Sequence, residues 1–225
     1  MKKFWWAKTY RPGRLATSIE PHLPGVSIED TRYELMGELN HRLAISRRPL
    51  DEDTTPSELR WMLKTVPEKK RALPDAFKGH MDSIIISEAF ETLLEGFDLG
   101  TSQIIELPLY DIKAKDKVGR TDVDTSKKDP RCWFLFHVTE SKDAFLPERS
   151  VGIRELQGWD KPMYAADTAV PPEIAVDQEA AASGPDVWRD PKLMDVVFFS
   201  DGFKRAIKSA KLKTPAFPFK PCVLD

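Results

Sequence analysis

The chain has 225 residues, of which 41% are hydrophobic and 31% are charged, and its 34 Lys and Arg against 36 Asp and Glu give a net charge of -2. This length allows one large domain, or two small domains packed together, with a substantial hydrophobic core. The near-neutral charge disfavours direct binding of nucleic acid or of an anionic membrane, because both normally require a basic surplus.

Neither the N-terminus nor the two cysteines are typical of an exported protein. The apolar residues 4–7 lie between lysines and form a run much shorter than the roughly 7 to 15 residues of a signal-peptide core. No apolar run approaches the roughly 18 residues of a membrane span. Cys132 and Cys222 lie far apart with no second pair near either, so we expect free thiols and no zinc site. We therefore expect a soluble, cytoplasmic protein without metal or other cofactor.

Three consecutive acidic residues, Asp51, Glu52 and Asp53, can be interpreted in two ways. Negative charge before a helix stabilises the positive end of the helix dipole and keeps a loop soluble. The alternative role is to meet a basic surface of a partner protein, where such charges would speed association.

A helix is predicted directly after this cluster. Thr55 can cap it, Pro56 suits its first position and Glu58 can close a capping box, while Pro67 ends it. The apolar residues of the segment have the spacing of one helix face: Leu59, Met62, Leu63 and Val66.

The most informative feature of the sequence is an internal repeat. Residues 81–90 (MDSIIISEAF) align without a gap on residues 194–203 (MDVVFFSDGF), and apolar residues at helical spacing follow in both copies. Each copy then enters a proline-containing extended segment. We therefore predict that residues 81–109 and 194–220 form equivalent strand–serine–helix–strand units.

In both units a serine separates the predicted strand from the predicted helix. The hydroxyls of Ser87 and Ser200 can accept hydrogen bonds from the first helical turn, and Glu88 and Asp201 follow where the helix dipole favours an acid. A nucleophilic serine is disfavoured, because neither copy has the G-x-S-x-G motif of hydrolases.

A charged segment follows the first unit. Residues 111–130 are rich in Lys, Arg and Asp, which indicates a solvated hairpin or loop. Within it, Asp122 and Asp124 could together hold Mg²⁺ or Mn²⁺, but the neighbouring basic residues favour ordinary surface charge pairing.

Two further segments lie between the units. Residues 132–138 (CWFLFHV) are aromatic or β-branched in most positions and predict a strand at the centre of a sheet. Residues 165–185 are rich in Ala, Pro and acids, and we expect a long surface excursion there with a helical turn.

Two tryptophans adjoin charged or turn residues. Trp159 lies in Gly158-Trp159-Asp160, and Trp188 precedes two charged residues. Tryptophan is frequent at binding interfaces because one rigid side chain buries a large area. We predict that Trp159, Asp160 and Trp188 contribute to a partner-binding surface, with core packing as the alternative.

Together these elements predict an α/β fold of the α+β type, with a mixed sheet, helices and long surface loops. We expect a loop-rich N-terminal subdomain at residues 1–78 and a second domain at 79–225 that contains both repeated units.

The repeated units, the strand at 132–138, the Gly158-Trp159-Asp160 motif and residues 196–203 resemble a bacterial family of immunity proteins from polymorphic toxin systems, first described as a domain of unknown function. The resemblance covers the chain from about Met81 to its C-terminus. It implies a cognate protein toxin, delivered by contact-dependent or type VI secretion, as the partner, and it implies no catalytic residues.

Three functions are therefore considered. The first is a non-enzymatic immunity protein that binds and neutralises a cognate antibacterial toxin. The second is an adaptor or regulatory module with an endogenous partner, and the third is a hydrolase that uses a metal at Asp122 and Asp124.

Overall fold

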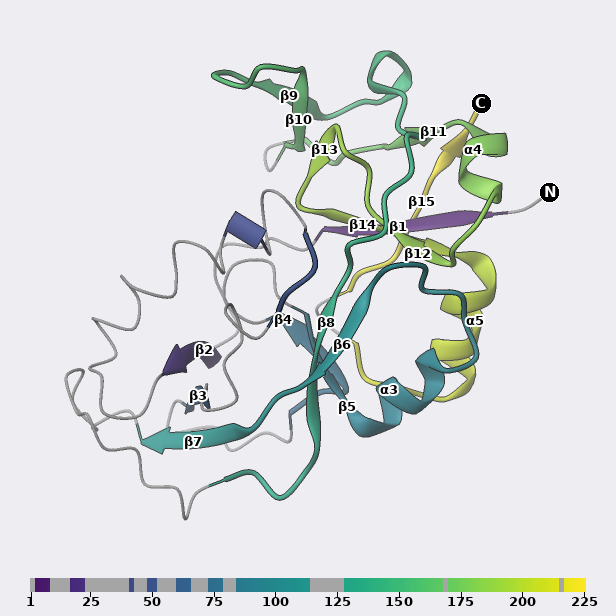
Figure 1. Cartoon of the computed structure of the whole chain (residues 1–225). Helices are drawn as coiled ribbons and strands as arrows, with labels where there is room; N and C mark the ends of the chain where they lie inside the picture. The colour runs from purple at the N-terminus through teal and green to yellow at the C-terminus, as the bar shows by residue number, and fades with distance from the viewer. Residues whose placement is uncertain are drawn as a thin grey trace.

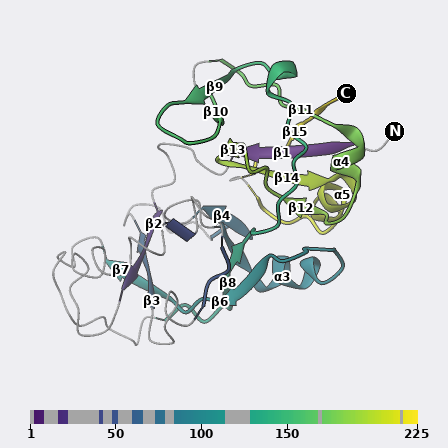
Figure 2. The same cartoon turned by 45° about the horizontal axis from the view of Figure 1, so that its top comes forward.

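The computed structural model of the chain is shown in Figure 1 and, turned by 45°, in Figure 2. It describes residues 3–8, 17–22, 41–42, 48–51, 60–65, 73–78, 84–113, 128–167, 170–214 and 217–225. These residues have an α+β fold, as predicted, and most of its elements are strands. None of the helices within these ranges is long and apolar enough to cross a membrane.

The first four-stranded sheet has the order β4-β5-β8-β6 and is antiparallel throughout. Its strands are β4 (Ala76–Lys78), β5 (Ile84–Ser87), β8 (Trp133–His137) and β6 (Gln103–Glu106). β8 pairs with β5 on one side and with β6 on the other, which confirms the prediction of a central strand at 132–138.

The second four-stranded sheet has the order β12-β14-β1-β15 and is also antiparallel. Its strands are β12 (Val187–Trp188), β14 (Val196–Ser200), β1 (Phe4–Lys8) and β15 (Lys220–Pro221). The N-terminal strand β1 therefore lies between two strands from the C-terminal part of the chain.

Smaller sheets and three α-helices complete the described part of the fold. A three-stranded sheet contains β13 (Leu193–Met194), β10 (Met163–Ala166) and β9 (Ile153–Leu156). Another contains β2 (Thr17–His22), β3 (Arg60–Thr65) and β7 (Leu109–Lys113), and β11 (Ala175–Val176) pairs with β16 (Val223–Leu224). The helices are α3 (Glu88–Leu94), α4 (Gln178–Ala182) and α5 (Asp201–Ser209), and Pro147–Arg149 form a 3-10 helix.

The repeat predicted from the sequence has the same order of elements in both copies. In the first copy β5, α3 and β6 follow one another, and in the second copy β14, α5 and β15 do so. Ser87 Oγ accepts from Phe90 N at 3.3 Å and Ser200 Oγ accepts from Phe203 N at 3.2 Å. The prediction that both serines cap helices is confirmed.

The two four-stranded sheets are equivalent beyond the predicted units. In each sheet the strand before the helix occupies the second place, and the strand after the helix occupies the opposite edge. The ring of Phe77 packs edge-on against Trp133 with centroids 5.3 Å apart, and Phe4 packs edge-on against Trp188 at 5.7 Å. β1 thus takes the place in the second sheet that β8 takes in the first.

An aspartate binds each capping serine. Asp75, directly before β4, accepts from Ser87 Oγ at 3.2 Å, and Asp186, directly before β12, accepts from Ser200 Oγ. The backbone carbonyls of the same aspartates accept from Ser87 N and Ser200 N, both at 2.8 Å. One serine hydroxyl can donate one hydrogen bond while it accepts another, so each serine joins a helix to an edge strand.

Each of these aspartates also contacts the other copy. Asp75 Oδ2 accepts from the backbone N–H of Lys213, which lies after α5, at 2.6 Å. Asp186 Oδ2 accepts from the backbone N–H of Asp98, which lies after α3, at 3.2 Å. The two units are therefore joined by reciprocal hydrogen bonds.

The sequence carries a signal for these aspartates that the repeat analysis missed. Residues 74–78 read PDAFK and residues 185–189 read PDVWR. The spacing from aspartate to serine differs by two residues between the copies, so an ungapped alignment does not detect the match.

Alternating residues of β14 enter two hydrophobic cores. Val197 and Phe199 pack in a core shared with α3, α5 and the first sheet, whereas Val196 and Phe198 pack in a second core with Trp6. Side chains alternate between the faces of a strand, so both faces of the second sheet are covered. This explains why β14 is apolar throughout rather than alternately polar.

Phenylalanines join α3 and α5 inside the first core. The ring centroid of Phe203 lies 6.2 Å from that of Phe90 and 5.0 Å from that of Phe97. Phe90 and Phe203 are 2% and 0% exposed. The side chains that follow each helix cap therefore form the contact between the two units.

Two predictions about local chain segments are wrong. Residues Arg60–Thr65, predicted as helix, form β3 between β2 and β7, because backbone pairing on both sides overrides a short helical spacing of apolar residues. The segment 165–185 is not a surface excursion: Ile174, Ala175 and Val176 are fully buried, because small and β-branched side chains allow β11 to pack closely. Its predicted helical turn is present as α4.

The predicted domain boundary at residues 78 and 79 is crossed by both four-stranded sheets. β4 pairs with β5, and β1 pairs with β14 and β15. Most of residues 111–130, including Asp122 and Asp124, and the predicted cap at Thr55 lie outside the described residues.

The packing of the repeated units predicts a ranking of stability effects. Phe203→Ala should reduce the free energy of unfolding by about 3 to 5 kcal/mol, because it leaves a cavity between α3 and α5. Ser200→Ala should reduce it by about 1 kcal/mol, through loss of the helix cap. Urea denaturation of both variants checks this ranking, and a larger loss for the serine variant would contradict it.

Candidate partner-binding surface

The β9–β10 hairpin presents the predicted Gly158-Trp159-Asp160 motif. β9 and β10 pair antiparallel from Met163 opposite Leu156 to Ala166 opposite Ile153. The connecting residues 157–162 are all exposed, and the side chain of Trp159 at their centre is 41% exposed. In Figures 1 and 2 this hairpin projects from the end of the molecule opposite to β2, β3 and β7.

A glycine allows the turn of this hairpin. Gly158 has a φ of +87°, in the region that residues with a Cβ rarely adopt, and no atom lies within 4 Å of where its Cβ would be. Substitution at this position would strain the backbone rather than clash with a neighbour. The glycine therefore fixes the direction in which the chain reaches Trp159.

The base of the hairpin is held by the buried part of the protein. Tyr164 N donates to Lys192 O at 2.8 Å, within the parallel pairing of β10 and β13, and its ring packs against Phe145 at 5.7 Å. Lys8 Nζ from β1 donates to the Ala166 carbonyl at 2.7 Å. The hairpin is thus an exposed tip on an ordered base.

A buried carboxylate organises the residues under this base. Asp190 is 0% exposed, and its oxygens accept from the backbone N–H groups of Ala144, Phe145 and Lys192 at 2.9, 2.7 and 2.8 Å. Burial raises the pKa of the Asp190 carboxyl above its ordinary value of 3.8, although the three N–H donors and the charge of Lys192 oppose this shift.

Trp188 does not belong to the surface. Its side chain is 0% exposed, stacks on Phe198 at 5.5 Å and lies under the Lys142 ammonium at 3.9 Å. The expectation that Trp188 is exposed is wrong, because the two charged residues that follow it, Arg189 and Asp190, are themselves buried.

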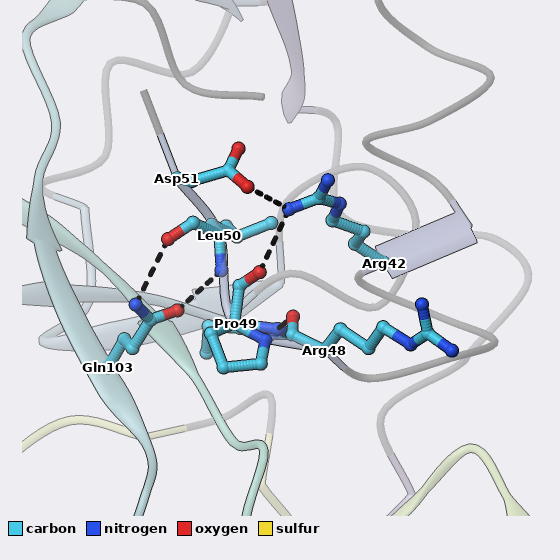
Figure 3. Close-up of polar contacts among 7 residues, drawn as sticks. Arg42, Arg48, Pro49, Leu50, Asp51 and Gln103 are labelled. Atoms are coloured by element: carbon cyan, nitrogen blue, oxygen red, sulfur yellow. Dashed lines mark hydrogen bonds and ion pairs between the residues drawn. The ribbon is translucent and has the colours of Figure 1, made fainter. Parts of the chain in front are cut away.

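Asp51 follows Leu50, which is bound to β6 of the first four-stranded sheet, as Figure 3 shows. Its exposed carboxylate binds the guanidinium of Arg42, which also donates to Pro49 O at 3.2 Å. The side-chain amide of Gln103, in β6, binds both backbone groups of Leu50 at 2.7 and 3.1 Å. The structure therefore does not bring Asp51 together with Trp159. Glu52 and Asp53 lie outside the described residues.

Exposed valines near the hairpin were missed by the sequence analysis. Val151 and Val170 are 55% and 46% exposed. The Val170 carbonyl oxygen lies 3.2 Å from where a Cβ on Gly152 would be, so the backbone at Val170 passes close to the residue that follows Val151. Isolated valines carry no sequence signal for exposure, so only the tertiary structure identifies these exposed side chains near the base of β9.

A shallow groove of about 200 Å³ lies beside β8 and is lined by residues 106–108 and 128–133. Arg131 binds the Asp129 carboxylate through two hydrogen bonds of 2.9 and 2.7 Å and stacks over Trp133. The hydrogen bonds from Arg131 lower the pKa of Asp129. Among the described residues, no three His, Cys, Asp or Glu side chains are arranged to bind a metal.

Comparison of the chain with protein-family models and with curated proteins finds no match. The assignment of a function therefore rests on the site and on the resemblance noted in the sequence.

The opposite pKa shifts of Asp190 and Asp129 predict opposite pH effects. As pH rises from below 3.8, wild type should lose stability relative to Asp190→Asn, because ionisation of a buried carboxyl is unfavourable in the folded state. Wild type should gain stability relative to Asp129→Asn over the same rise, because the folded state favours the charged form of Asp129. Urea denaturation across pH measures both differences, and slopes of equal sign would contradict the assignment.

The two cysteines should differ in reactivity. Both are free, Cys132 is exposed, and burial raises the pKa of the Cys222 thiol. Alkylation of the native protein should therefore modify Cys132 first, and Cys222 should react at a comparable rate only in denaturant. The variant Cys132→Ser should lose the fast phase, and its persistence in this variant would overturn the prediction.

Proposed function

We propose that the chain is a non-enzymatic immunity protein, which binds and neutralises a cognate antibacterial toxin in the cytoplasm of the producing cell and its siblings. The observation that carries this proposal is the exposed Trp159 at the tip of a hairpin with an ordered base. The hairpin contains one of the motifs by which the sequence resembles the immunity family.

The hairpin has the physical properties of a binding element. An exposed indole loses little conformational freedom on binding and buries a large apolar area. The ordered base under β10 reduces the entropy that association would cost. The adjacent exposed charges of Asp160 and Lys161 can orient a partner without favouring a strongly acidic or a strongly basic one.

The acidic residues Asp51, Glu52 and Asp53 have a secondary role in this proposal. They contribute mainly to the rate of association, through long-range attraction to a basic partner surface. Because Asp51 is already paired with Arg42, its contribution is smaller than that of an unpaired carboxylate.

The proposal predicts tight binding with a local hot spot. An immunity protein that suppresses a lethal activity requires nanomolar affinity or better, which corresponds to about -12 kcal/mol. Trp159→Ala should weaken binding by about 2 kcal/mol or more. The test is co-expression with the product of a neighbouring toxin-like gene in a sensitive host, together with calorimetry of the purified pair.

Controls separate the function from the site. Cys132→Ser changes an exposed residue directly before β8, away from the hairpin, and should leave rescue intact. If Trp159→Ala rescues the host as well as wild type does, the immunity function is retained and the hairpin is rejected as the binding site. Absence of rescue and of binding to any neighbouring gene product would reject the immunity function in favour of an adaptor with an endogenous partner.

A further inference from the structure

The two equivalent helices carry opposite charges at matching positions. The repeat alignment pairs Glu91, Glu95 and Asp98 of the first unit with Lys204, Lys208 and Lys211 of the second. We call these sets the acidic row and the basic row. The two rows have the same spacing in the sequence and opposite sign. Glu91 lies within α3 and Glu95 is its C-cap, whereas Lys204 and Lys208 lie within α5. Asp98 and Lys211 follow the two helices.

The two helices that carry these rows lie on one side of the molecule. α3 and α5 are neighbours, joined by Phe90 and Phe203, and both lie away from β2, β3 and β7 in Figures 1 and 2. The residues of the rows belong to the solvent-facing sides of the helices and their C-terminal turns. Glu95, Asp98, Lys208 and Lys211 are exposed.

The rows do not neutralise each other within the chain. Among the ion pairs of the described residues, none joins the acidic row to the basic row, and the pair on α5 joins Arg205 to Asp201. Lys204 packs over the ring of Trp5 instead. Burial lowers the pKa of Lys204, and the charges of Lys208 and Lys3 lower it further, although the charge of Asp201 opposes this shift.

We propose that this face binds a second copy of the chain, with the acidic row of each copy on the basic row of the other. Such a contact is isologous, since a twofold axis between the copies forms both row-to-row contacts at once. The small net charge of -2 adds little repulsion between two copies.

A second copy fits this face better than a polyanion does. A nucleic acid attracted to the basic row would be repelled by the acidic row on the neighbouring helix. A second copy neutralises both rows together, because each row meets the row of opposite sign. This pairing is independent of the β9–β10 hairpin, so it leaves the proposed toxin-binding surface free.

The pairing should depend strongly on salt, because exposed charges interact over about 30 Å at 0.01 M ionic strength and over about 3 Å at 1 M. Sedimentation velocity of the full chain should give a dimer at about 0.01 M salt and a monomer at about 1 M. A monomer at low salt and at about 0.1 mM chain would overturn the proposal.

Charge reversal provides the specific test. Glu91→Lys with Glu95→Lys makes both rows basic, and Lys208→Glu with Lys211→Glu makes both rows acidic. Each double variant should be monomeric at low salt. An equimolar mixture of the two should form a heterodimer, which a folding defect in either variant would not produce.

A matched control reverses charges on the hairpin. Arg154→Glu with Lys161→Glu reverses two exposed positive charges outside both repeated units, and the dimer should persist. Loss of the dimer in this control, or failure of the two reversed variants to associate with each other, would reject the row-to-row contact. Toxin rescue by the double variants is a separate measurement, so failure of the dimer and failure of the proposed function remain distinguishable.

Discussion

The hydrogen bonds between two serines and two aspartates fix how the two halves of this protein are assembled. Each serine caps a helix and binds the aspartate that begins an edge strand, and each aspartate accepts an N–H from the loop after the other helix. A single bond of this kind contributes only about 1 kcal/mol. Its structural effect is larger, because strand, helix and neighbouring unit must all be in place for the donors and acceptors to be satisfied.

The candidate binding surface depends on the same assembly. The second four-stranded sheet is covered on both faces. The chain that leaves this sheet after β12 contains the buried Asp190, which accepts hydrogen bonds from three backbone N–H groups beneath the hairpin. Burial of this carboxyl is costly, as its raised pKa indicates, and the hydrogen bonds offset part of that cost. The result is an ordered base from which an exposed tryptophan projects.

Comparison of the two copies shows which positions the fold requires and at which surface positions the residues can differ. The capping serines, the aspartates and the apolar positions that face the core are equivalent in both copies, because each satisfies a hydrogen bond or fills the space between α3 and α5. The solvent-facing positions are free of these requirements. There one copy carries acids and the other lysines, which gives the molecule a face with two rows of opposite charge.

The sequence by itself determined the repeated units, their caps and the central strand β8, because these depend on local hydrogen bonds and on unbroken apolar runs. Trp159, predicted from the sequence to contribute to a partner-binding surface, is exposed in the structure. Sequence reasoning misassigned Trp188 and residues 60–65, since burial and strand pairing there depend on segments distant in the chain. The insertion of β1 between β14 and β15 was likewise decided only by tertiary structure. An apolar N-terminal strand has no local preference for one sheet over another, and its place is set by which sheet lacks a central strand.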